Sequence, residues 1–210
     1  AGEHPIAMVR GEDEKLSFVS PDANRTIVYR INGGKPQEYK APVPFRDGGK
    51  VEAWYKDDKA TVATQTFHKI ENVPLSVLFC SSQETGGEGV EHIVDNNTST
   101  YWHTMYSVTV AQYPHWVDFD ANGTKLMKGF VYVPRQDGPN GRIKDYEIYV
   151  SQDGKNWGSP IAKGTFPNGS KQQRVDFAQP VRARYIRFKA LSSQNGQDFA
   201  SAAEFILIAD

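Results

Sequence analysis

The stretch of residues 94–104 concentrates side chains that can do chemistry. It carries carboxylate, amide, hydroxyl, indole and imidazole groups in close succession. Carboxylate and amide oxygens are ligands for hard cations such as calcium, and the same groups hydrogen-bond to polar ligands. The stretch has neither helical nor strand periodicity. This predicts an ordered loop on a rigid scaffold, which is where recognition groups concentrate.

Two aspartates further along the chain raise the question of catalysis. In the strand predicted over residues 116–120, alternation places Asp118 and Asp120 on one face with Trp116, and Val117 and Phe119 on the other. Glycoside hydrolysis needs two carboxyl groups on opposite sides of the scissile bond. A same-face pair two residues apart is more typical of a solvated strand, so we predict no catalytic role for these aspartates.

Cysteine and histidine usage argues against zinc. Cys80 is the only cysteine, so no internal disulfide and no cysteine-based zinc site can form, and we expect this residue to pack. His103 has no second histidine at ligand spacing. A zinc site at His103 is therefore not predicted.

Composition excludes several classes of partner. The chain has 210 residues, of which 39% are apolar and 23% charged, and its formal net charge is −1. Lysine and arginine are scattered, which argues against nucleic acid or an anionic membrane as partner. No apolar run approaches the roughly 18 residues that cross a bilayer. The start at Ala1 lacks the basic and apolar regions of a signal peptide and fits a processed or excised chain.

The first third of the chain predicts a small β-sandwich. Short alternating runs at residues 16–19, 26–31, 51–55 and 61–67 are typical of strands, and Asn-Gly-Gly and Asp-Gly-Gly between them favour hairpins. The pattern of residues 31–36, 39–42 and 51–54 resembles the fibronectin-like domain of chitobiase-type β-hexosaminidases. We expect a fibronectin- or immunoglobulin-like spacer over residues 1–70. Some other immunoglobulin-like sandwich fits equally well.

The remainder predicts a second, larger β domain. Residues 68–75 lack periodicity and contain Pro74, which favours a linker. Strand patterns then recur with turn signals at residues 116–120, 128–133, 146–150, 173–177, 184–190 and 204–208. No stretch of ten or more residues has helical periodicity. The chain is thus expected to be all-β, with a jelly-roll sandwich over residues 75–210.

This second domain resembles a known family. The resemblance rests on residues 101–104, 114–120, 129–136, 143–157, 183–188 and 202–205, which occur in the family's order. Together they resemble the discoidin, or coagulation factor 5/8 type C, fold, and within it the bacterial carbohydrate-binding modules of family 32. The resemblance implies two sites at one end of the sandwich.

The first implied site is a structural calcium ion. Family members wrap the ion with a loop of the form Asp-x-Asn-x-x-Thr and close it with a late glutamate. The implied ligands are side chains of Asp95, Asn97, Thr100 and Glu204 and main-chain oxygens of His92 and Ala203. Such a set suits calcium, which takes six to eight hard oxygen ligands. The alternative is that Asp95 and Asn97 only form Asx-turns.

The second implied site is a sugar pocket. Galactose-binding members use a histidine, an arginine, an asparagine and a late aromatic residue, which correspond here to His103, Arg135, Asn140 and Phe199. Gln136 and Asn195 are candidates for the rim, whereas Trp102 and Trp116 are expected to pack in the sandwich. On spacing alone, Arg135 and Asn140 would be ordinary turn residues and His103 a satisfied loop histidine.

The resemblance implies a binding role rather than catalysis. We expect the non-catalytic C-terminal region of a larger, chitobiase-like glycoside hydrolase that is secreted, periplasmic or on a bacterial cell surface. Its partners would be glycans with terminal galactose-type or N-acetylhexosamine sugars and the parent catalytic domain. The alternatives are a structural module pair that packs on a catalytic domain, and a small hydrolase in its own right.

Overall fold

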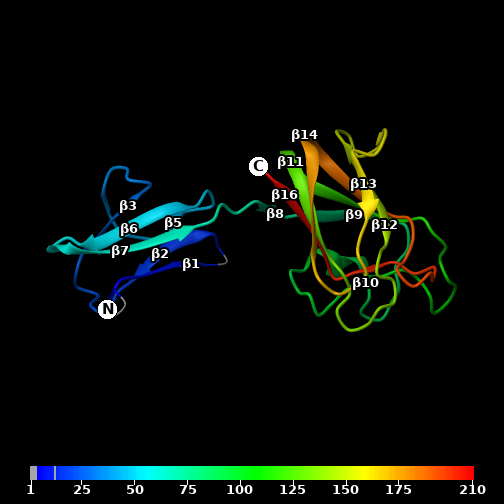
Figure 1. Cartoon of the computed structure of the whole chain (residues 1–210), viewed down its shortest axis with the longest axis horizontal. Helices are drawn as coiled ribbons and strands as arrows, with labels where there is room; N and C mark the ends of the chain where they lie inside the picture. Colours follow the sequence, from blue (N-terminus) through cyan, green and yellow to red (C-terminus); the bar gives the residue numbers. More distant parts are fainter. Residues whose placement is uncertain (1–3, 12) are drawn as a thin grey trace. The chain divides into compact units, whose positions relative to one another are not determined.

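The computed structural model describes residues 4–11 and 13–210. The chain divides into two compact units, Ala1–Glu71 and Asn72–Asp210 (Figure 1). Asn72 and Val73, which we expected in a linker, instead form strand β8 (Asn72–Val73) of the second unit. They pair with the last strand, β16 (Glu204–Ala209), because main-chain groups beside a free sheet edge gain hydrogen bonds there.

The N-terminal unit is built from two antiparallel sheets. A three-stranded sheet has the order β1-β2-β5, and a four-stranded sheet has the order β4-β3-β6-β7. The strands are β1 (Ala7–Arg10), β2 (Lys15–Val19), β3 (Ile27–Ile31), β4 (Gln37–Glu38), β5 (Val43–Pro44), β6 (Gly49–Tyr55) and β7 (Asp58–Phe67). Apolar residues at alternate positions, such as Leu16 and Phe18 or Val51 and Ala53, form one core between the sheets.

The C-terminal unit is a β-sandwich organised on two long strands. These are β11 (His115–Val133) and β14 (Gln173–Ala190), each of which joins two runs that the sequence predicts separately. They pair along most of their length, with register shifts between Asp120 and Lys125 and between Met127 and Gly129. Asn122 and Gly123 lie at the first shift with positive φ angles, which only such residues adopt readily.

The two halves of β11 have different neighbours. Its first half pairs with β9 (Ser76–Cys80), and its second half pairs with β16. Strands β12 (Asp145–Ser151) and β13 (Ala162–Thr165) extend the sheet beyond β14. The remaining elements are a 3-10 turn, η1 (Val90–Val94), and the paired strands β10 (Trp102–His103) and β15 (Ser201–Ala202). The expected all-β fold is confirmed, with this short turn as an addition.

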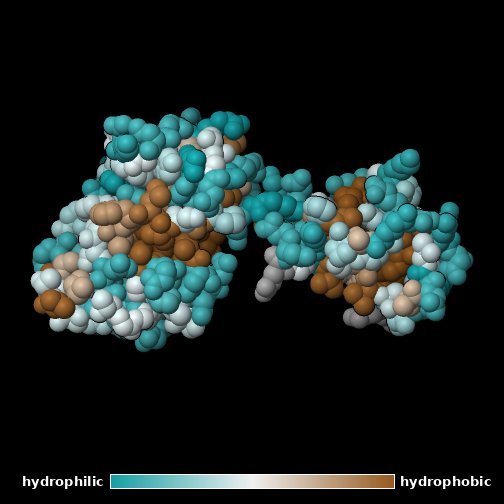
Figure 2. All heavy atoms as spheres, turned by 180° about the vertical axis from the view of Figure 1, so that it is seen from behind, coloured by the Kyte–Doolittle hydropathy of each residue, from teal (hydrophilic) through white to brown (hydrophobic). Residues whose placement is uncertain are grey.

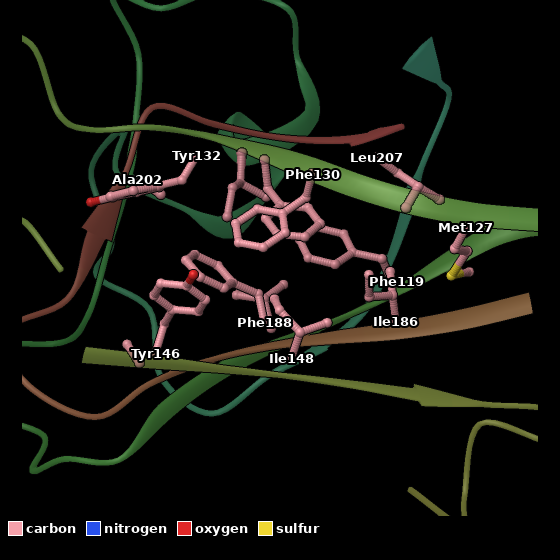
Figure 3. Close-up of a cluster of buried hydrophobic side chains, with 14 of the residues drawn as sticks. Phe119, Met127, Phe130, Tyr132, Tyr146, Ile148, Ile186, Phe188, Ala202 and Leu207 are labelled. Carbon is pink, nitrogen blue, oxygen red and sulfur yellow. The ribbon is translucent and has the colours of Figure 1, made fainter. Parts of the chain in front are cut away.

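Aromatic rings fill the space between the layers (Figure 3). Phe205 stacks on Phe119, with ring centroids 4.8 Å apart, and on Phe130, with centroids 5.2 Å apart. Trp102 is only 1% exposed, so the expectation that it packs in the sandwich is confirmed. Each buried side chain of this size contributes about 2–3 kcal/mol through loss of apolar surface from water.

The outer face of the sheet explains the two aspartates of β11. Asp118 accepts two hydrogen bonds from Arg187, at 2.6 and 2.9 Å, and Asp120 accepts two from Arg184. Trp116 lies on the same face, 5.5 Å from the Arg187 guanidinium, so the expectation that it packs inside the sandwich is wrong. Each carboxylate is thus engaged in a forked ion pair, and neither is placed as an acid or base.

Some apolar side chains of the C-terminal unit are exposed. Figure 2 shows a continuous hydrophobic area in the middle of its visible face, bordered by hydrophilic atoms. Leu78 and Phe79 on β9 are about half exposed, at 50% and 52%, and Val108 is 85% exposed. Single residues of this kind are ordinary on a protein surface, and they supply control positions for experiments.

Candidate functional site

Four loops meet beside β10 and β15 at one end of the C-terminal sandwich. Thr104 donates its main-chain N–H to the Ala200 oxygen, and the Ala200 N–H donates to the Thr104 hydroxyl, both at 3.0 Å. Ser201 donates its N–H to the Gly141 oxygen at 2.8 Å, which ties the 134–142 loop to the same place. The Tyr113 hydroxyl donates to the Phe199 oxygen. These bonds bring together residues far apart in sequence.

His103 lies at the centre of this end. The backbone pairing of β10 with β15 places it opposite Ser201, and the residue is 2% exposed. Its ring Nδ1 lies 2.7 Å from the Thr104 oxygen. Since a carbonyl only accepts, Nδ1 carries the hydrogen and Nε2 of the neutral ring is an acceptor. Burial lowers the pKa of His103, which keeps the imidazole neutral at pH 7.

Two aromatic rings surround the His103 imidazole. The Phe199 ring centroid lies 5.2 Å from it, and the Tyr106 ring lies 4.7 Å from it in an edge-on arrangement. The two rings are 6.0 Å from each other. Phe199 is half-buried and Tyr106 is 40% exposed, so both offer ring surface to a ligand. Tyr106 was missed from the sequence because a tyrosine in a polar loop carries no spacing signal.

Arg135 packs against Tyr101, which in turn is near His103. Its guanidinium carbon is 4.3 Å from the Tyr101 ring centroid, and this ring is 6.5 Å from that of His103. The Arg135 Nε donates to Asp137 at 2.6 Å. The Arg142 Nε donates to the main-chain oxygen of Arg135 at 3.1 Å. Arg135 is therefore held in place by its neighbours, with its two terminal nitrogens available.

Glu88 is a further member of the site that the sequence did not reveal. Its carboxylate accepts a hydrogen bond from the Tyr106 hydroxyl at 2.6 Å and lies near enough to the Tyr101 hydroxyl to act on its pKa. Burial and this carboxylate raise the pKa of Tyr101 to about 12, and the carboxylate also raises the pKa of Tyr106. The Glu88 main-chain oxygen accepts from the His103 N–H at 3.1 Å. Glu88 thus joins Tyr106 to the histidine strand and acts on Tyr101.

Asn140 and the predicted rim residues are less closely joined to this cluster. Asn140 is exposed, and its main-chain oxygen accepts from the Ser201 hydroxyl at 2.7 Å. Gln136 donates to the Pro134 and Ser170 oxygens. Asn195 hydrogen-bonds within its own loop, to Gln197. The structure therefore gathers His103 and Phe199, places Arg135 against the Tyr101 ring, and leaves Asn140 on the adjoining loop.

Glu84 supports the loop that carries Tyr106. This glutamate is 3% exposed and accepts hydrogen bonds from the main-chain N–H groups of Tyr106 and Ser107, at 2.9 and 2.8 Å, and from the Ser107 hydroxyl at 2.7 Å. These bonds lower the pKa of Glu84 to about 2. The bonds fix the Tyr106 backbone against the histidine strand.

The six residues implied as metal ligands also lie near the end of β16. The main-chain N–H of Asn97 donates to Asp95 at 2.9 Å and to Glu204 at 3.1 Å. The Thr100 hydroxyl donates to Asp95, and the His92 ring Nδ1 is 3.1 Å from the same carboxylate. Ala203 is buried beside Glu204.

The Asp95 and Glu204 carboxylates lie close together, and both accept from the Asn97 N–H. Burial and the neighbouring Asp95 carboxylate raise the pKa of Glu204 to about 8. Burial also acts to raise the pKa of Asp95, but the neighbouring Glu204 carboxyl group and a hydrogen bond from Thr100 outweigh it and lower the value to about 2. Two carboxylates in contact need either a shared proton or a cation between them. The donor set therefore fits a hard cation.

The Asx-turn alternative is also visible in this loop. Asp95 accepts from the N–H two residues on, and the Asn97 side-chain oxygen accepts from the Ser99 N–H at 3.0 Å. No group of three or more histidine, cysteine, aspartate and glutamate side chains is placed to hold a metal within residues 4–11 and 13–210. The expected ligand set has only two carboxylates, so this observation does not bear on it.

The fold and the candidate site define a class of protein: a β-sandwich with loops from several parts of the chain gathered at one end. The factor 5/8 type C domain model, described as "F5/8 type C domain", matches residues 78–205, and the chain belongs to this family. The family resemblance seen in the sequence is thereby confirmed.

One of the similar proteins matches this chain over both units. A sialidase of Micromonospora viridifaciens is 39% identical over 204 residues, which cover 95% of this chain and 30% of the sialidase. A galactose oxidase of Gibberella zeae is 39% identical over 127 residues, covering 60% of this chain and 18% of the oxidase. The chain thus spans less than a third of the length of these relatives.

Solved structures of similar modules match the C-terminal unit. The module CpGH89CBM32-5 of Clostridium perfringens, in complex with GalNAc-β-1,3-galactose, is 28% identical with a TM-score of 0.60. That match covers 66% of this chain and 99% of the module. The family 32 module of C. perfringens NanJ, in complex with galactose, is 26% identical with a TM-score of 0.58 and covers 65% and 97%, respectively.

Proposed function

We propose that the C-terminal unit binds the terminal galactose-type sugar of a glycan in the pocket around His103. The observation that carries this proposal is the meeting of the Phe199 and Tyr106 rings with the His103 imidazole, beside the Arg135 guanidinium. An aromatic ring packs against the C–H face of a galactoside, and a fixed guanidinium donates to neighbouring hydroxyls. The His103 Nε2 atom accepts a hydroxyl hydrogen.

The comparisons support the same ligand class. The similar C. perfringens modules were solved with galactose and with GalNAc-β-1,3-galactose, and their family is that of carbohydrate-binding modules. Such modules bind and do not cut, which agrees with the ion-paired state of Asp118 and Asp120. We therefore propose a non-catalytic binding module. Asn140 is proposed as a ligand contact from the family pattern.

The parent protein is proposed to be a larger glycan-processing enzyme. We expected a chitobiase-type parent, and chitobiase domains are among the similar structures at 23% identity, a level that shows the fold alone. The sialidase match at 39% identity spans both units and supports a sialidase-type parent more strongly. In either parent the N-terminal sandwich would act as a spacer of immunoglobulin or fibronectin type.

Such an enzyme would meet its glycans outside the cell. We therefore propose a secreted, periplasmic or cell-surface location for the parent protein. No helix in the part of the chain that the structure describes is long and apolar enough to cross a membrane.

We propose in addition that calcium binds at Asp95 and Glu204. The two carboxylates both accept from the Asn97 N–H, so they lie close enough for one divalent cation to neutralise both. Asn97, Thr100 and main-chain oxygens of His92 and Ala203 would complete the oxygen set. The ion would be structural, since it would tie the 95–100 loop to the last strand and take no part in sugar recognition.

A titration tests the sugar site. Methyl β-D-galactopyranoside is expected to bind with a dissociation constant of about 0.1–1 mM, as is usual for one shallow monosaccharide site. Arg135→Ala and Phe199→Ala should each abolish measurable binding and leave the melting temperature nearly unchanged. The matched controls are Arg184→Ala and Phe79→Ala, an arginine and an exposed aromatic residue outside the pocket. Absence of binding to galactose-type sugars by the folded wild type would favour a purely structural module instead.

A further inference from the structure

The pocket is rich in hydrogen-bond acceptors. The His103 Nδ1–H is given to the Thr104 oxygen, which leaves Nε2 as an acceptor. The Glu88 carboxylate accepts the Tyr106 hydroxyl hydrogen and, with about four lone-pair sites, has capacity for another donor. An imidazole nitrogen with a lone pair and a carboxylate attract hydroxyl and ammonium groups, and both repel an anion.

The charges around the pocket also disfavour an anionic ligand. The charged groups that act on the His103 imidazole are Glu88, Arg135 and Glu84, which are two carboxylates and one guanidinium. Arg135 is itself paired with a third carboxylate, Asp137, at 2.6 Å. Among the groups that act on His103, the one cation is therefore already balanced by its neighbour. Arg142 contacts the site through its Nε, which donates to the Arg135 main-chain oxygen. Of the two carboxylates that act on His103, Glu84 is buried and Glu88 is partly exposed, so Glu88 is the one that a ligand can approach.

We infer that the pocket selects neutral and amino sugars against acidic ones, and that Glu88 is the residue that discriminates. The inference rests on the proposed sugar site and specifies the ligand class. Galactosides that carry a carboxylate or sulfate meet the Glu88 charge at short range, where little solvent intervenes. The repulsion is expected to weaken binding of a singly charged galactoside by about fivefold to tenfold at low salt.

The wild-type chain provides the first test. Four ligands are titrated calorimetrically: methyl β-D-galactopyranoside, the corresponding uronate with a carboxylate at C6, methyl β-D-fucopyranoside, and methyl 2-amino-2-deoxy-β-D-galactopyranoside. The fucoside lacks the 6-hydroxyl but is neutral, so it separates loss of a hydroxyl from gain of charge. The uronate should bind at least fivefold more weakly than the fucoside at low salt, and 1 M NaCl should narrow the gap. The amino sugar should bind no more weakly than the galactoside.

A pair of variants provides the second test. Glu88→Gln should bring the affinities for the uronate and the fucoside to within about twofold. Glu147→Gln is the matched control, because Glu147 also accepts a tyrosine hydroxyl, that of Tyr149 at 3.1 Å, but lies on β12 outside the pocket. This control should keep the wild-type ratio.

The outcomes separate this inference from the proposed function. The charge selection is wrong if the wild type binds the galactoside and also binds the uronate and the fucoside with equal affinity. In that case the proposed sugar site still stands. Failure of all four ligands to bind overturns it together with the proposed sugar site. The wild-type ratio and its salt dependence decide the question even where Glu88→Gln does not fold.

Discussion

The Arg135 guanidinium carbon lies 4.3 Å from the Tyr101 ring centroid, and the Tyr101 ring lies 6.5 Å from the His103 ring in an edge-on arrangement. One tyrosine thus sets the spacing between the two polar groups that we propose for sugar recognition. A cation over a tyrosine ring contributes roughly 0.5–2 kcal/mol. Part of the ordering of Arg135 therefore depends on a residue that need not touch ligand.

Replacing this tyrosine should weaken binding without unfolding the module. Tyr101→Ala is expected to lower galactoside affinity about threefold to tenfold, because Arg135 loses the surface that orients it. Calorimetric titration measures the effect. Tyr185→Ala is the control, since its ring lies 5.3 Å from Arg184 outside the site. Unchanged affinity in Tyr101→Ala would show that Asp137 alone orients the guanidinium.

Sugar binding should be insensitive to pH over the range in which His103 stays neutral. Burial lowers the His103 pKa below its ordinary value near 6.5, so the ring gains a proton only in more acidic solution. Protonation converts Nε2 from acceptor to donor. Affinity should therefore be constant from pH 8 to 6.5 and decrease at lower pH. Nitrogen NMR of the imidazole, recorded with the titration, identifies the group; a midpoint above 6.5 would contradict the assignment.

The buried Glu84 carboxylate should make the module sensitive to acid. Its pKa in the folded chain is about 2, below the ordinary value of 4.5. A lowered folded pKa means that its stabilisation is complete above the unfolded value and is lost as pH falls from about 4.5 towards 2. Glu84→Gln should lower the melting temperature at pH 7, and its difference from wild type should shrink at pH 3. A constant difference across this range would assign the effect to packing.

Removal of calcium should destabilise the C-terminal unit. In the proposed site the ion relieves the contact between Asp95 and Glu204, so EDTA is expected to lower the melting temperature by several degrees, and added calcium should restore it. Asp95→Asn should remove the response to chelator. Asp153→Asn is the control, because Asp153 is another turn-forming aspartate, in the hairpin after β12. An identical melt with and without chelator would refute this ligand set.

The architecture was predictable where alternation of apolar residues was clean. Val117 and Phe119 are fully buried as the pattern at residues 116–120 predicts. The joining of two predicted strands into β11 was not predictable, because Asn122 and Gly123 favour a turn as much as the bulge that they form. Likewise, Trp102 and His103 look like loop residues, since a two-residue strand has no measurable period.

Only those residues of the candidate site that belong to the family pattern were predictable from the sequence. His103, Arg135 and Phe199 were named from that pattern, and the structure brings His103 and Phe199 into ring contact. Glu88 and Tyr106 were missed because they reach the site through side-chain contacts between loops. Sequence spacing does not encode such contacts. The hydrogen bond from the Tyr106 hydroxyl to the Glu88 carboxylate is the contact that places both residues in the candidate site.

The two residues of β10 have different surroundings: Trp102 is buried in the sandwich core, and His103 packs against the Tyr106 and Phe199 rings of the proposed sugar site. One peptide unit therefore couples the interior of the domain to the proposed recognition surface. The 134–142 and 193–199 loops, by contrast, hold exposed residues such as Asp137 and Asn195 that the core does not constrain. Sequence changes in these loops would alter the glycan preference of the proposed site without moving His103. One scaffold would thus provide several specificities.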